Sequence, residues 1–305
     1  MERLKGLLPA AFTPMDAEGH VRVEPIPALV ERLIDDGIAG LYVCGSTGEG
    51  PSLSMSERKR VAKAYVDAAG GRVPVVVQVG HNSLEEARDL AAHAASVGAD
   101  AISATPPAYF KPRDQQALAT CIKHIADAAP GTPFYYYHIP VMTGVSVDVP
   151  QLLLHAAESM PTLAGVKFSD RDLDMMHRCL ALEGRRFDVL FGVDEMLLGA
   201  LVMGCEGAVG STYNLMTPLY RDLMRFFDSG NHAEARTRQL CAAEVIQVLV
   251  GYHGISGIKA AMSLKGHECG PTRLPLQPLT EQEFAQMRDE LAGLGFLAGA
   301  VIGSA

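Results

Sequence analysis

A lysine inside an apolar, strand-like segment is the first residue that could carry chemistry. Lys167 lies between Val166 and Phe168 in the segment Leu163-Ala-Gly-Val-Lys-Phe-Ser-Asp170. Burying a charged ammonium group is costly, so burial lowers the pKa of a lysine and favours the neutral amine. A neutral amine can attack a ketone and form an iminium. The alternative is a lysine at a strand end whose ammonium group reaches solvent.

Tyr137 is the second candidate, because it ends a strand-like run that directly precedes the run carrying Lys167. Neighbouring strands lie about 4.8 Å apart, so two inward side chains at similar height can share one substrate. A phenol in such a place can relay a proton. Strand alternation puts Tyr135 on the face of Tyr137 and puts Tyr136 and His138 on the other. We expect Tyr135 and Tyr136 to be packing residues with satisfied hydroxyls, and His138 to orient a neighbour or pack.

A glycine-bounded loop, Gly45-Ser-Thr-Gly-Glu49, follows another predicted strand. Its glycines allow backbone N–H groups to approach an anion, and Ser46 and Thr47 add hydroxyl donors. Such a loop suits a carboxylate or a phosphate. It is not a P-loop, since the Gly-Lys-Ser/Thr ending is absent. A plain strand-to-helix turn is the alternative.

Two adjacent acidic residues, Asp194 and Glu195, follow a later strand. Their carboxylates could accept hydrogen bonds from the hydroxyls of a polyol. The alternative is helix capping, because acidic residues are common in a first helical turn. A glycosidase needs two carboxylates that face each other across the scissile bond, and sequence neighbours do not provide that arrangement.

Eight apolar runs are predicted as strands, and they are continuous rather than alternating, which is typical of parallel strands covered on both faces. They are Gly6–Thr13, Gly40–Cys44, Val73–Val79, Ala99–Thr105, Thr132–Ile139, Leu163–Phe168, Phe187–Val193 and Gly207–Ser211.

Amphipathic segments alternate with these runs and are predicted as helices. They are Glu24–Asp36, Ser54–Ala69, Ser83–Val97, Asp114–Ala128, Val149–Met160, Asp170–Glu183, Glu195–Cys205 and Thr217–Ser229. We expect capping boxes at Ser54–Glu57 and Ser169–Asp172, and C-terminal caps at Gly37, Gly98 and Gly184.

Eight strand–helix pairs predict an α/β fold, a (β/α)8 TIM barrel whose site lies at the C-terminal ends of the strands. A doubly wound sheet is disfavoured, because no G-x-G-x-x-G turn follows the first strand. After Gly230 the pattern is purely helical. We therefore expect a catalytic barrel domain over residues 1–230 and a C-terminal helical region packed on it over 231–305. Its helices are predicted at His232–Tyr252, Ser256–Lys265 and Glu281–Leu294.

The composition excludes several classes of protein. A net charge of −9 over 305 residues disfavours a nucleic-acid partner. The N-terminus has no apolar signal-peptide core, and the apolar residues 296–305 are too few to span a membrane, so we expect no membrane partner. None of the six cysteines forms a C-x-x-C pair or a zinc spacing, which favours buried thiols in a cytoplasmic protein and no metal site.

Five segments in this order resemble the dihydrodipicolinate synthase/N-acetylneuraminate lyase family. They are Phe12-Thr-Pro14, Gly45-Ser-Thr-Gly-Glu49, Tyr137-His-Ile-Pro140, Gly165-Val-Lys167 and Gly207-Ala-Val-Gly-Ser211. The resemblance covers nearly the whole chain. It implies a barrel with a C-terminal helical region, usually a homotetramer. It also implies that Lys167 forms a Schiff base, that Tyr137 relays a proton, and that Ser46 and Thr47 hold a pyruvate carboxylate.

Within the family, the segments are similar to the lyase branch rather than the synthase branch. The synthases carry an arginine two residues after the Tyr-x-x-Pro proline, where this chain has Met142. The lyase branch implies reversible cleavage of N-acetylneuraminate to N-acetylmannosamine and pyruvate, with no metal or organic cofactor. It implies that the sugar is held by Ser169, Gly192, Asp194, Glu195 and Ser211, with Tyr109 near the site and a subunit contact.

Two alternatives stay open from the sequence. One is a related pyruvate-dependent aldolase that acts on another 2-oxo (keto-deoxy) sugar acid. The other is a catalytically idle barrel that binds sialic acid or a partner protein. The joint presence of Lys167, Tyr137 and the Ser46–Thr47 loop speaks against the idle barrel.

Overall fold

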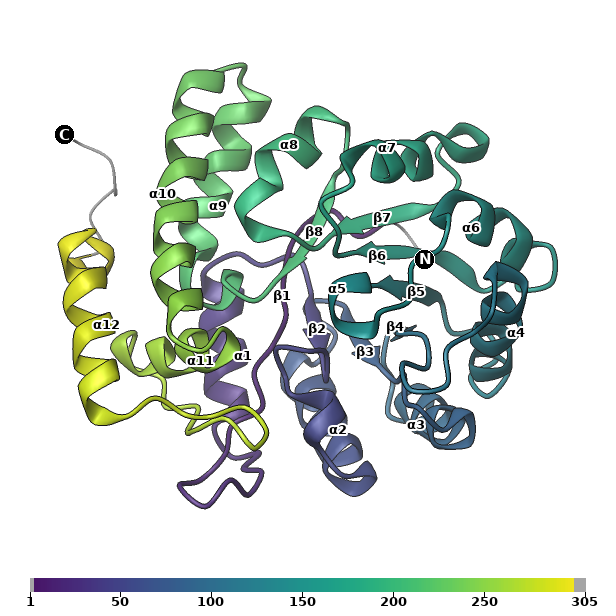
Figure 1. The fold of residues 1–305 in the computed structure, drawn as a ribbon, viewed down its shortest axis with the longest axis horizontal. Coiled ribbons are helices and arrows are strands. Elements are labelled where there is room, and N and C mark those ends of the chain that lie inside the picture. Colours follow the sequence, from purple (N-terminus) through teal and green to yellow (C-terminus); the bar gives the residue numbers. More distant parts are fainter. Residues whose placement is uncertain (1–2, 299–305) are drawn as a thin grey trace.

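The computed structural model describes residues 3–298, in which strands and helices alternate along the chain (Figure 1). Residues 1–2 and 299–305 lie outside the described range. The first two residues of the predicted region 1–230 and the last seven of the predicted region 231–305 are therefore not described, and these seven include most of the apolar residues 296–305.

Eight parallel strands form one sheet in the order β1-β8-β7-β6-β5-β4-β3-β2. The two end strands approach each other through a parallel bridge between Ala10 and Tyr42, so the sheet closes into a barrel. The predicted (β/α)8 barrel is therefore confirmed. The strands are β1 (Gly6–Pro9), β2 (Leu41–Val43), β3 (Val75–Gln78), β4 (Ala101–Ala104), β5 (Phe134–His138), β6 (Leu163–Phe168), β7 (Asp188–Phe191) and β8 (Gly207–Gly210).

Most of these strands are shorter than predicted, because the apolar runs continue into loops that are buried but do not continue the strand. Phe12 and Thr13, for example, lie beyond the end of β1 and are still buried. An apolar run therefore indicates which residues are buried, and it is longer than the strand that it contains.

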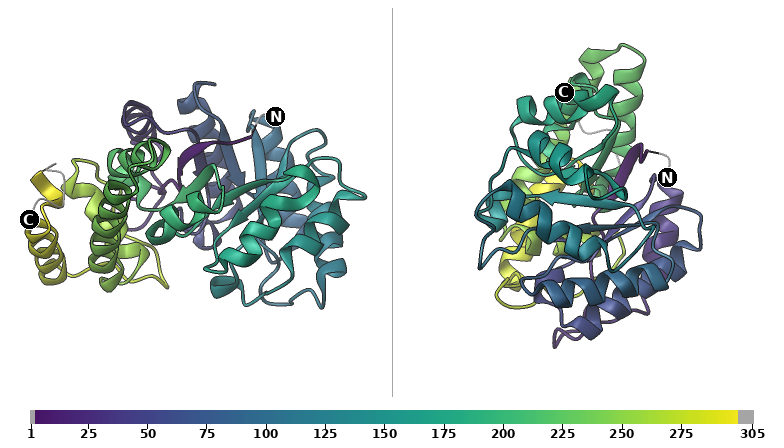
Figure 2. Two further views of the ribbon diagram at one scale, coloured as in Figure 1. Left: turned by 90° about the horizontal axis from the view of Figure 1, so that it is seen from above. Right: turned by 90° about the vertical axis from the view of Figure 1, so that its right-hand side faces the viewer.

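Eight helices follow the strands and cover the outside of the barrel (Figures 1 and 2). They are α1 (Ile26–Asp35), α2 (Met55–Ala69), α3 (Leu84–Ser96), α4 (Gln115–Ala126), α6 (Val149–Ala157), α7 (Leu173–Ala181), α8 (Leu197–Val202) and α9 (Tyr213–Asp228). Short turns that sequence reasoning missed are α5 (Pro140–Thr143) after β5 and the 3-10 turns η1 (Gly50–Ser52), η2 (Leu182–Gly184), η3 (Asp194–Met196) and η4 (Phe296–Ala298).

The predicted caps are partly confirmed. Ser54 and Glu57 form the expected capping box at the start of α2. Gly37 and Gly98 follow α1 and α3 with positive φ, as C-terminal caps do. Gly184 does not cap α7, which already ends at Ala181.

The capping box predicted at Ser169–Asp172 is wrong. Asp172 is itself the N-cap of α7 and accepts a hydrogen bond of 2.9 Å from the backbone N–H of Met175. Ser169 and Asp170 thus precede the helix and are free to face the mouth of the barrel, where both line a cavity.

Buried side chains form two layers, as strand alternation requires. One cluster fills the inside of the barrel and includes Leu8, Tyr42, Tyr135, Tyr137 and Val209. The other lies between the strands and the helices. Tyr136 belongs to this outer cluster, so the predicted division of the β5 tyrosines between two faces is confirmed.

Three further helices flank the barrel on one side, as Figures 1 and 2 both show: α10 (His232–Gly251), α11 (Ile255–Leu264) and α12 (Glu281–Gly293). The predicted helices there are confirmed within a residue at each end. Helix α10 packs against α9, α8 and η3. Within residues 3–298 no single helix is long and apolar enough to cross a membrane; α10 and α11 meet that criterion only as a pair, bent by 110°.

A buried ion pair ties this helical region to the loop that follows β2. The Nζ of Lys259 on α11 lies 2.7 Å from Oε1 of Glu49, and the two side chains are 1% and 0% exposed. Lys259 also donates to the carbonyl of Pro271, while Glu49 Oε2 accepts the N–H of Arg273. The carboxylate is thus held from both sides by the C-terminal region, and this fixes the end of the Gly45–Glu49 loop.

Replacing Lys259 by Met should destabilise the chain by about 3–5 kcal/mol, because the Glu49 carboxylate is left buried without its partner. The free energy of unfolding in urea measures this. Lys63→Met is the matched control: Lys63 pairs with Asp67 on the exposed face of α2, and its loss should cost under about 1 kcal/mol. Equal effects of the two substitutions would contradict the structural role given to Lys259.

Candidate active site

The C-terminal ends of the strands carry the candidate site. Parallel barrels place their functional side chains at this end, and their opposite end is associated with stability. The opposite end has its own open cavity of about 980 Å³, lined mainly by residues that precede strands, such as Arg3, Lys5 and Pro133. Leu4, one of its lining residues, donates its N–H to the buried Asp188 carboxylate, which also accepts a hydrogen bond from the Tyr135 hydroxyl.

Lys167 lies deep in the mouth of the barrel, beside Tyr137. The two residues are direct register partners between β5 and β6. The Lys167 side chain is buried, with 3% of its surface exposed. Its Nζ lies 4.0 Å from the centre of the Tyr137 ring. The prediction that these two side chains point inward at the same height is confirmed, and the alternative of a solvated lysine is excluded by the burial.

The surroundings of Lys167 favour a neutral amine. Burial lowers the pKa of Lys167, and the nearby Tyr137 and Asp194 oppose that effect only in part. A lowered pKa increases the share of the neutral amine, the nucleophilic form, at any given pH.

Tyr42 completes the surroundings of Lys167, and sequence reasoning missed it. Nζ of Lys167 lies 3.8 Å from the centre of the Tyr42 ring, and the Tyr42 and Tyr137 rings meet edge to face at 5.6 Å. The Tyr42 hydroxyl donates to Ser103 Oγ at 3.1 Å, and burial raises its pKa. The strand that carries Tyr42 has only three residues, too few to show from the sequence which side chain enters the barrel.

The Gly45–Glu49 loop lies over these aromatic rings. A Cβ atom on Gly45 would come within 2.7 Å of Cε1 of Tyr42, so only glycine permits this approach. The loop brings Ser46 Oγ to 3.4 Å from the Tyr137 hydroxyl, while Thr47 is buried beside it. Hydroxyl donors and loop backbone therefore meet next to the phenol, where a small carboxylate could bind.

Five of the residues expected to hold a sugar line one cavity of about 530 Å³. They come from the ends of three strands: Ser169 after β6, Gly192, Asp194 and Glu195 after β7, and Ser211 after β8. Other lining residues were missed, among them Asp170 and Arg171, and Ile246, Val250 and Ile258 of α10 and α11. Ser46 and Met142 line a second cavity of about 360 Å³, and Ile139 lines both cavities.

The two acidic residues of this cavity have different environments. Asp194 is buried, and its Oδ2 accepts hydrogen bonds from the Thr212 N–H at 2.9 Å and the Thr212 hydroxyl at 2.6 Å. Burial raises the pKa of Asp194 to about 6. Glu195 is partly exposed and pairs with Arg171 at 2.9 Å. Neither carboxylate caps the turn that it begins, so capping does not explain them.

The remaining candidates from β5 and the following loops lie elsewhere. The Tyr135 hydroxyl is satisfied by Asp188, as expected, but the Tyr136 hydroxyl has no hydrogen-bond partner among the described residues. His138 is fully buried, and its Nε2 lies 3.4 Å from Asp170 Oδ2. Tyr109 is 79% exposed and lines neither of the two cavities, so its contact with the site stays a prediction.

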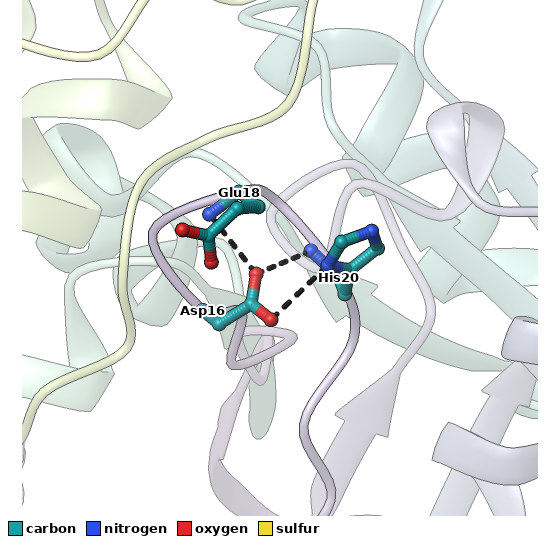
Figure 3. Close-up of side chains that lie close together, drawn as sticks. All are labelled: Asp16, Glu18 and His20. Carbon is teal, nitrogen blue, oxygen red and sulfur yellow. Dashed lines mark hydrogen bonds and ion pairs between the residues drawn. The ribbon is translucent and has the colours of Figure 1, made fainter.

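One group of metal-ligating side chains lies close together in the described part of the chain: Asp16, Glu18 and His20 (Figure 3). Both Asp16 oxygens already accept hydrogen bonds, from the backbone N–H groups of Glu18 and His20 and from the His20 ring. These contacts stabilise the turn between Met15 and Val21, and none of the three residues lines a cavity of the barrel mouth. The group is accounted for as a surface turn.

The chain is similar in sequence to N-acetylneuraminate lyases and in structure to a sialic acid aldolase. The chain is 44% identical to N-acetylneuraminate lyase A of Xenopus laevis over 281 residues, 90% of this chain and 91% of the relative. It is 40% identical to N-acetylneuraminate lyase of Mus musculus over 303 residues, 97% and 94% of the two chains. The solved structure of the sialic acid aldolase of Aliivibrio salmonicida matches with a TM-score of 0.94 and 38% identity, covering 97% and 98%.

A dihydrodipicolinate synthase from Bacillus anthracis also superposes, with a TM-score of 0.90 and 27% identity, covering 96% of this chain and 99% of the other. The barrel itself is thus common to both branches, and identity is higher for the three lyases named above. The model of the dihydrodipicolinate synthetase family matches residues 3–293. The chain therefore belongs to the dihydrodipicolinate synthetase family.

Proposed function

We propose that this chain is an N-acetylneuraminate lyase, a class I aldolase that reversibly cleaves N-acetylneuraminate to N-acetylmannosamine and pyruvate. The observation that carries the proposal is the buried Lys167 amine beside Tyr137, next to a cavity lined by Ser169, Asp194 and Glu195. The names of the 40–44% identical relatives support the same activity. Met142, in place of the synthase arginine, offers no guanidinium for a second carboxylate.

In the proposed mechanism, the neutral Lys167 amine attacks the C2 ketone of the open-chain sugar acid. Loss of water gives an iminium, which acts as the electron sink, so the step requires no metal or organic cofactor. Tyr137, together with the substrate's own carboxylate, accepts the C4 hydroxyl proton as the C3–C4 bond breaks. The product enamine is then protonated and hydrolysed to release pyruvate.

The remaining residues bind substrate in this proposal. Ser46 and Thr47 hold the carboxylate next to Tyr137, which fits the 3.4 Å between Ser46 Oγ and the phenol oxygen. The lining of the larger cavity holds the polyol tail. Ionised carboxylates accept hydrogen bonds, so those that line the cavity can bind the hydroxyl groups of a polyol, which donate them.

Assembly and location are proposed on separate grounds. We infer a homotetramer from the family, supported by apolar side chains that stand exposed on the single chain, among them Tyr109, Phe110, Val141 and Met142. Tyr109 would then meet a neighbouring subunit. We infer a cytoplasmic location because the six cysteines, all within the described residues, form no disulfide.

Cleavage of N-acetylneuraminate with identification of both products tests the proposal. The wild-type chain should release N-acetylmannosamine and pyruvate in equal amounts. Lys167→Ala should abolish cleavage, because no other amine is expected to form the iminium. Tyr137→Phe should lower kcat by about 10²- to 10⁴-fold through loss of the proton relay. No cleavage of N-acetylneuraminate, together with release of pyruvate from another 2-oxo sugar acid, would instead support a related aldolase for that substrate.

Asp194 gives the proposal a pH dependence. Its pKa of about 6 means that the acceptor carboxylate is lost as the pH falls through 6. The KM for N-acetylneuraminate should therefore rise below pH 6. The KM for pyruvate in the reverse reaction should not follow it, because pyruvate carries no tail. Asp194→Asn should abolish this pH dependence and leave the KM for N-acetylneuraminate high at every pH.

Acid unfolding does not explain such a rise. A carboxyl whose pKa is raised from 3.8 to about 6 in the fold contributes stability that is present below pH 3.8 and is lost as the pH rises through 6. Protonating Asp194 thus favours the folded chain while it weakens tail binding. A KM that stays flat between pH 7 and 5 in the wild type would contradict the role given to Asp194.

A further inference from the structure

Tyr42 is an aromatic residue of the barrel interior that the proposed mechanism does not use. It lies in the middle of β2, is fully buried, and lines neither of the two mouth cavities. Its hydroxyl donates to Ser103 Oγ at 3.1 Å, and Ser103 is itself fully buried on β4. The hydroxyl is therefore occupied inside the barrel, and the position of the ring remains to be explained.

The ring of Tyr42 faces the reacting nitrogen. Nζ of Lys167 lies over it, 3.8 Å from the ring centre, and lies over the Tyr137 ring at 4.0 Å. The two rings meet edge to face, with an angle of 79° between their planes, so Nζ has an aromatic face on two sides. Gly45 packs against the edge of the Tyr42 ring, where a Cβ would come within 2.7 Å of Cε1, so the loop leaves this ring little room to move.

Imine formation creates a positive charge at this nitrogen. The neutral amine adds to the ketone carbon, and the nitrogen loses one proton. The carbonyl oxygen takes up two protons, one of them from solvent, and leaves as water, so a C=N bond replaces the C=O bond and the nitrogen gains one positive charge. Lys167 forms no ion pair with a carboxylate of residues 3–298, and Asp194 raises its pKa through charge alone. No carboxylate of the described chain thus contacts the new charge.

The aromatic faces are the groups that contact it. The face of a ring carries a negative electrostatic potential and attracts a cation within about 6 Å of the ring centre, most strongly where water is excluded. Water is excluded here, since Lys167 is 3% exposed and Tyr42 is fully buried. A neutral amine gains much less from the ring, so the ring favours the charged adduct over the resting state. The gain is largest when the resting amine is neutral, because an ammonium group already carries the same charge.

We propose that Tyr42 is a further catalytic residue, whose ring face stabilises the iminium on Lys167 independently of its hydroxyl. The inference rests on the proposed function and adds a residue to its machinery. Tyr137 offers a second face, but its phenol also relays a proton in the proposed mechanism, so substitution there changes two effects at once. At Tyr42 the two effects are separable, because its hydroxyl is bonded to Ser103.

Reductive trapping with pyruvate tests the role of the ring. The measured quantity is the pyruvate concentration that gives half of the maximal adduct on Lys167 in a short borohydride pulse, at the alkaline end of the pH range in which the chain stays folded. Tyr42→Phe keeps the ring face and should raise this concentration by less than about threefold. Pentafluorophenylalanine at position 42 has a similar shape but an electron-poor face. It should raise the concentration by about tenfold or more, the loss expected for a cation–π contact in a desolvated site.

The fluorinated ring is more informative than Tyr42→Leu, which would also leave a cavity beside the amine. The same replacement at Tyr136 is the matched control. Tyr136 is fully buried on β5 but belongs to the outer cluster between the strands and the helices. Its hydroxyl has no hydrogen-bond partner among the described residues, so its loss breaks no contact. Pentafluorophenylalanine at position 136 should leave the half-saturating pyruvate concentration unchanged, and thermal unfolding of each variant shows that it is folded.

Equal values for phenylalanine and pentafluorophenylalanine at position 42 would overturn the inference. If both stayed near the wild type, the charge of the ring face would have no effect, and if both rose tenfold, the hydroxyl would carry the effect. An equal rise with the fluorinated ring at position 136 would also overturn it, since any buried fluorinated ring would then act in the same way. These outcomes leave the proposed function intact, whereas the absence of any Lys167 adduct in the wild type would overturn the proposed function and the inference with it.

Discussion

The burial of one amine is the constraint on which the rest of this structure depends. In the proposed mechanism, the Lys167 amine must be shielded from water so that it gives up its proton, and it must also be within reach of a substrate. The fold meets both needs by placing the amine on β6, between the rings of Tyr42 and Tyr137, which lie 3.8 and 4.0 Å from Nζ. Aromatic faces remove water while still tolerating the transient positive charge of an iminium. A strand, rather than a loop, fixes the height of the amine against its partner on β5.

The other features of the mouth follow from that arrangement. Gly45 has no side chain because Tyr42 occupies the space where a Cβ would lie, and the loop that starts there carries Ser46 to the phenol. The same loop ends at Glu49, whose carboxylate is held by Lys259 from the C-terminal helices. The helical region is thus joined to the Gly45–Glu49 loop by a buried ion pair, and α10 and α11 also supply apolar lining to the cavity that we propose for the polyol tail.

Much of the candidate site could be predicted from the sequence, because its residues lie in or directly after strands, where side chains alternate between the two faces with a period of two. Alternation and chain order were enough to bring Tyr137 and Lys167 together, and the strand ends located Ser169, Asp194 and Ser211 at one mouth. Tyr42 was missed because a three-residue strand shows no period of its own. Arg171 was missed because a local pattern was interpreted as a helix cap. The contributions of α10 and α11 depend on packing between segments far apart in the chain, which no local pattern reports.

The most direct test of the central claim is reductive trapping. The folded chain is incubated with pyruvate and borohydride, digested, and examined by mass spectrometry. If Lys167 is the amine that forms the iminium, one stable pyruvate-derived adduct should appear on the peptide that contains Lys167, and no adduct should form in Lys167→Ala. An adduct on a different lysine, or none in the wild type, would contradict the account.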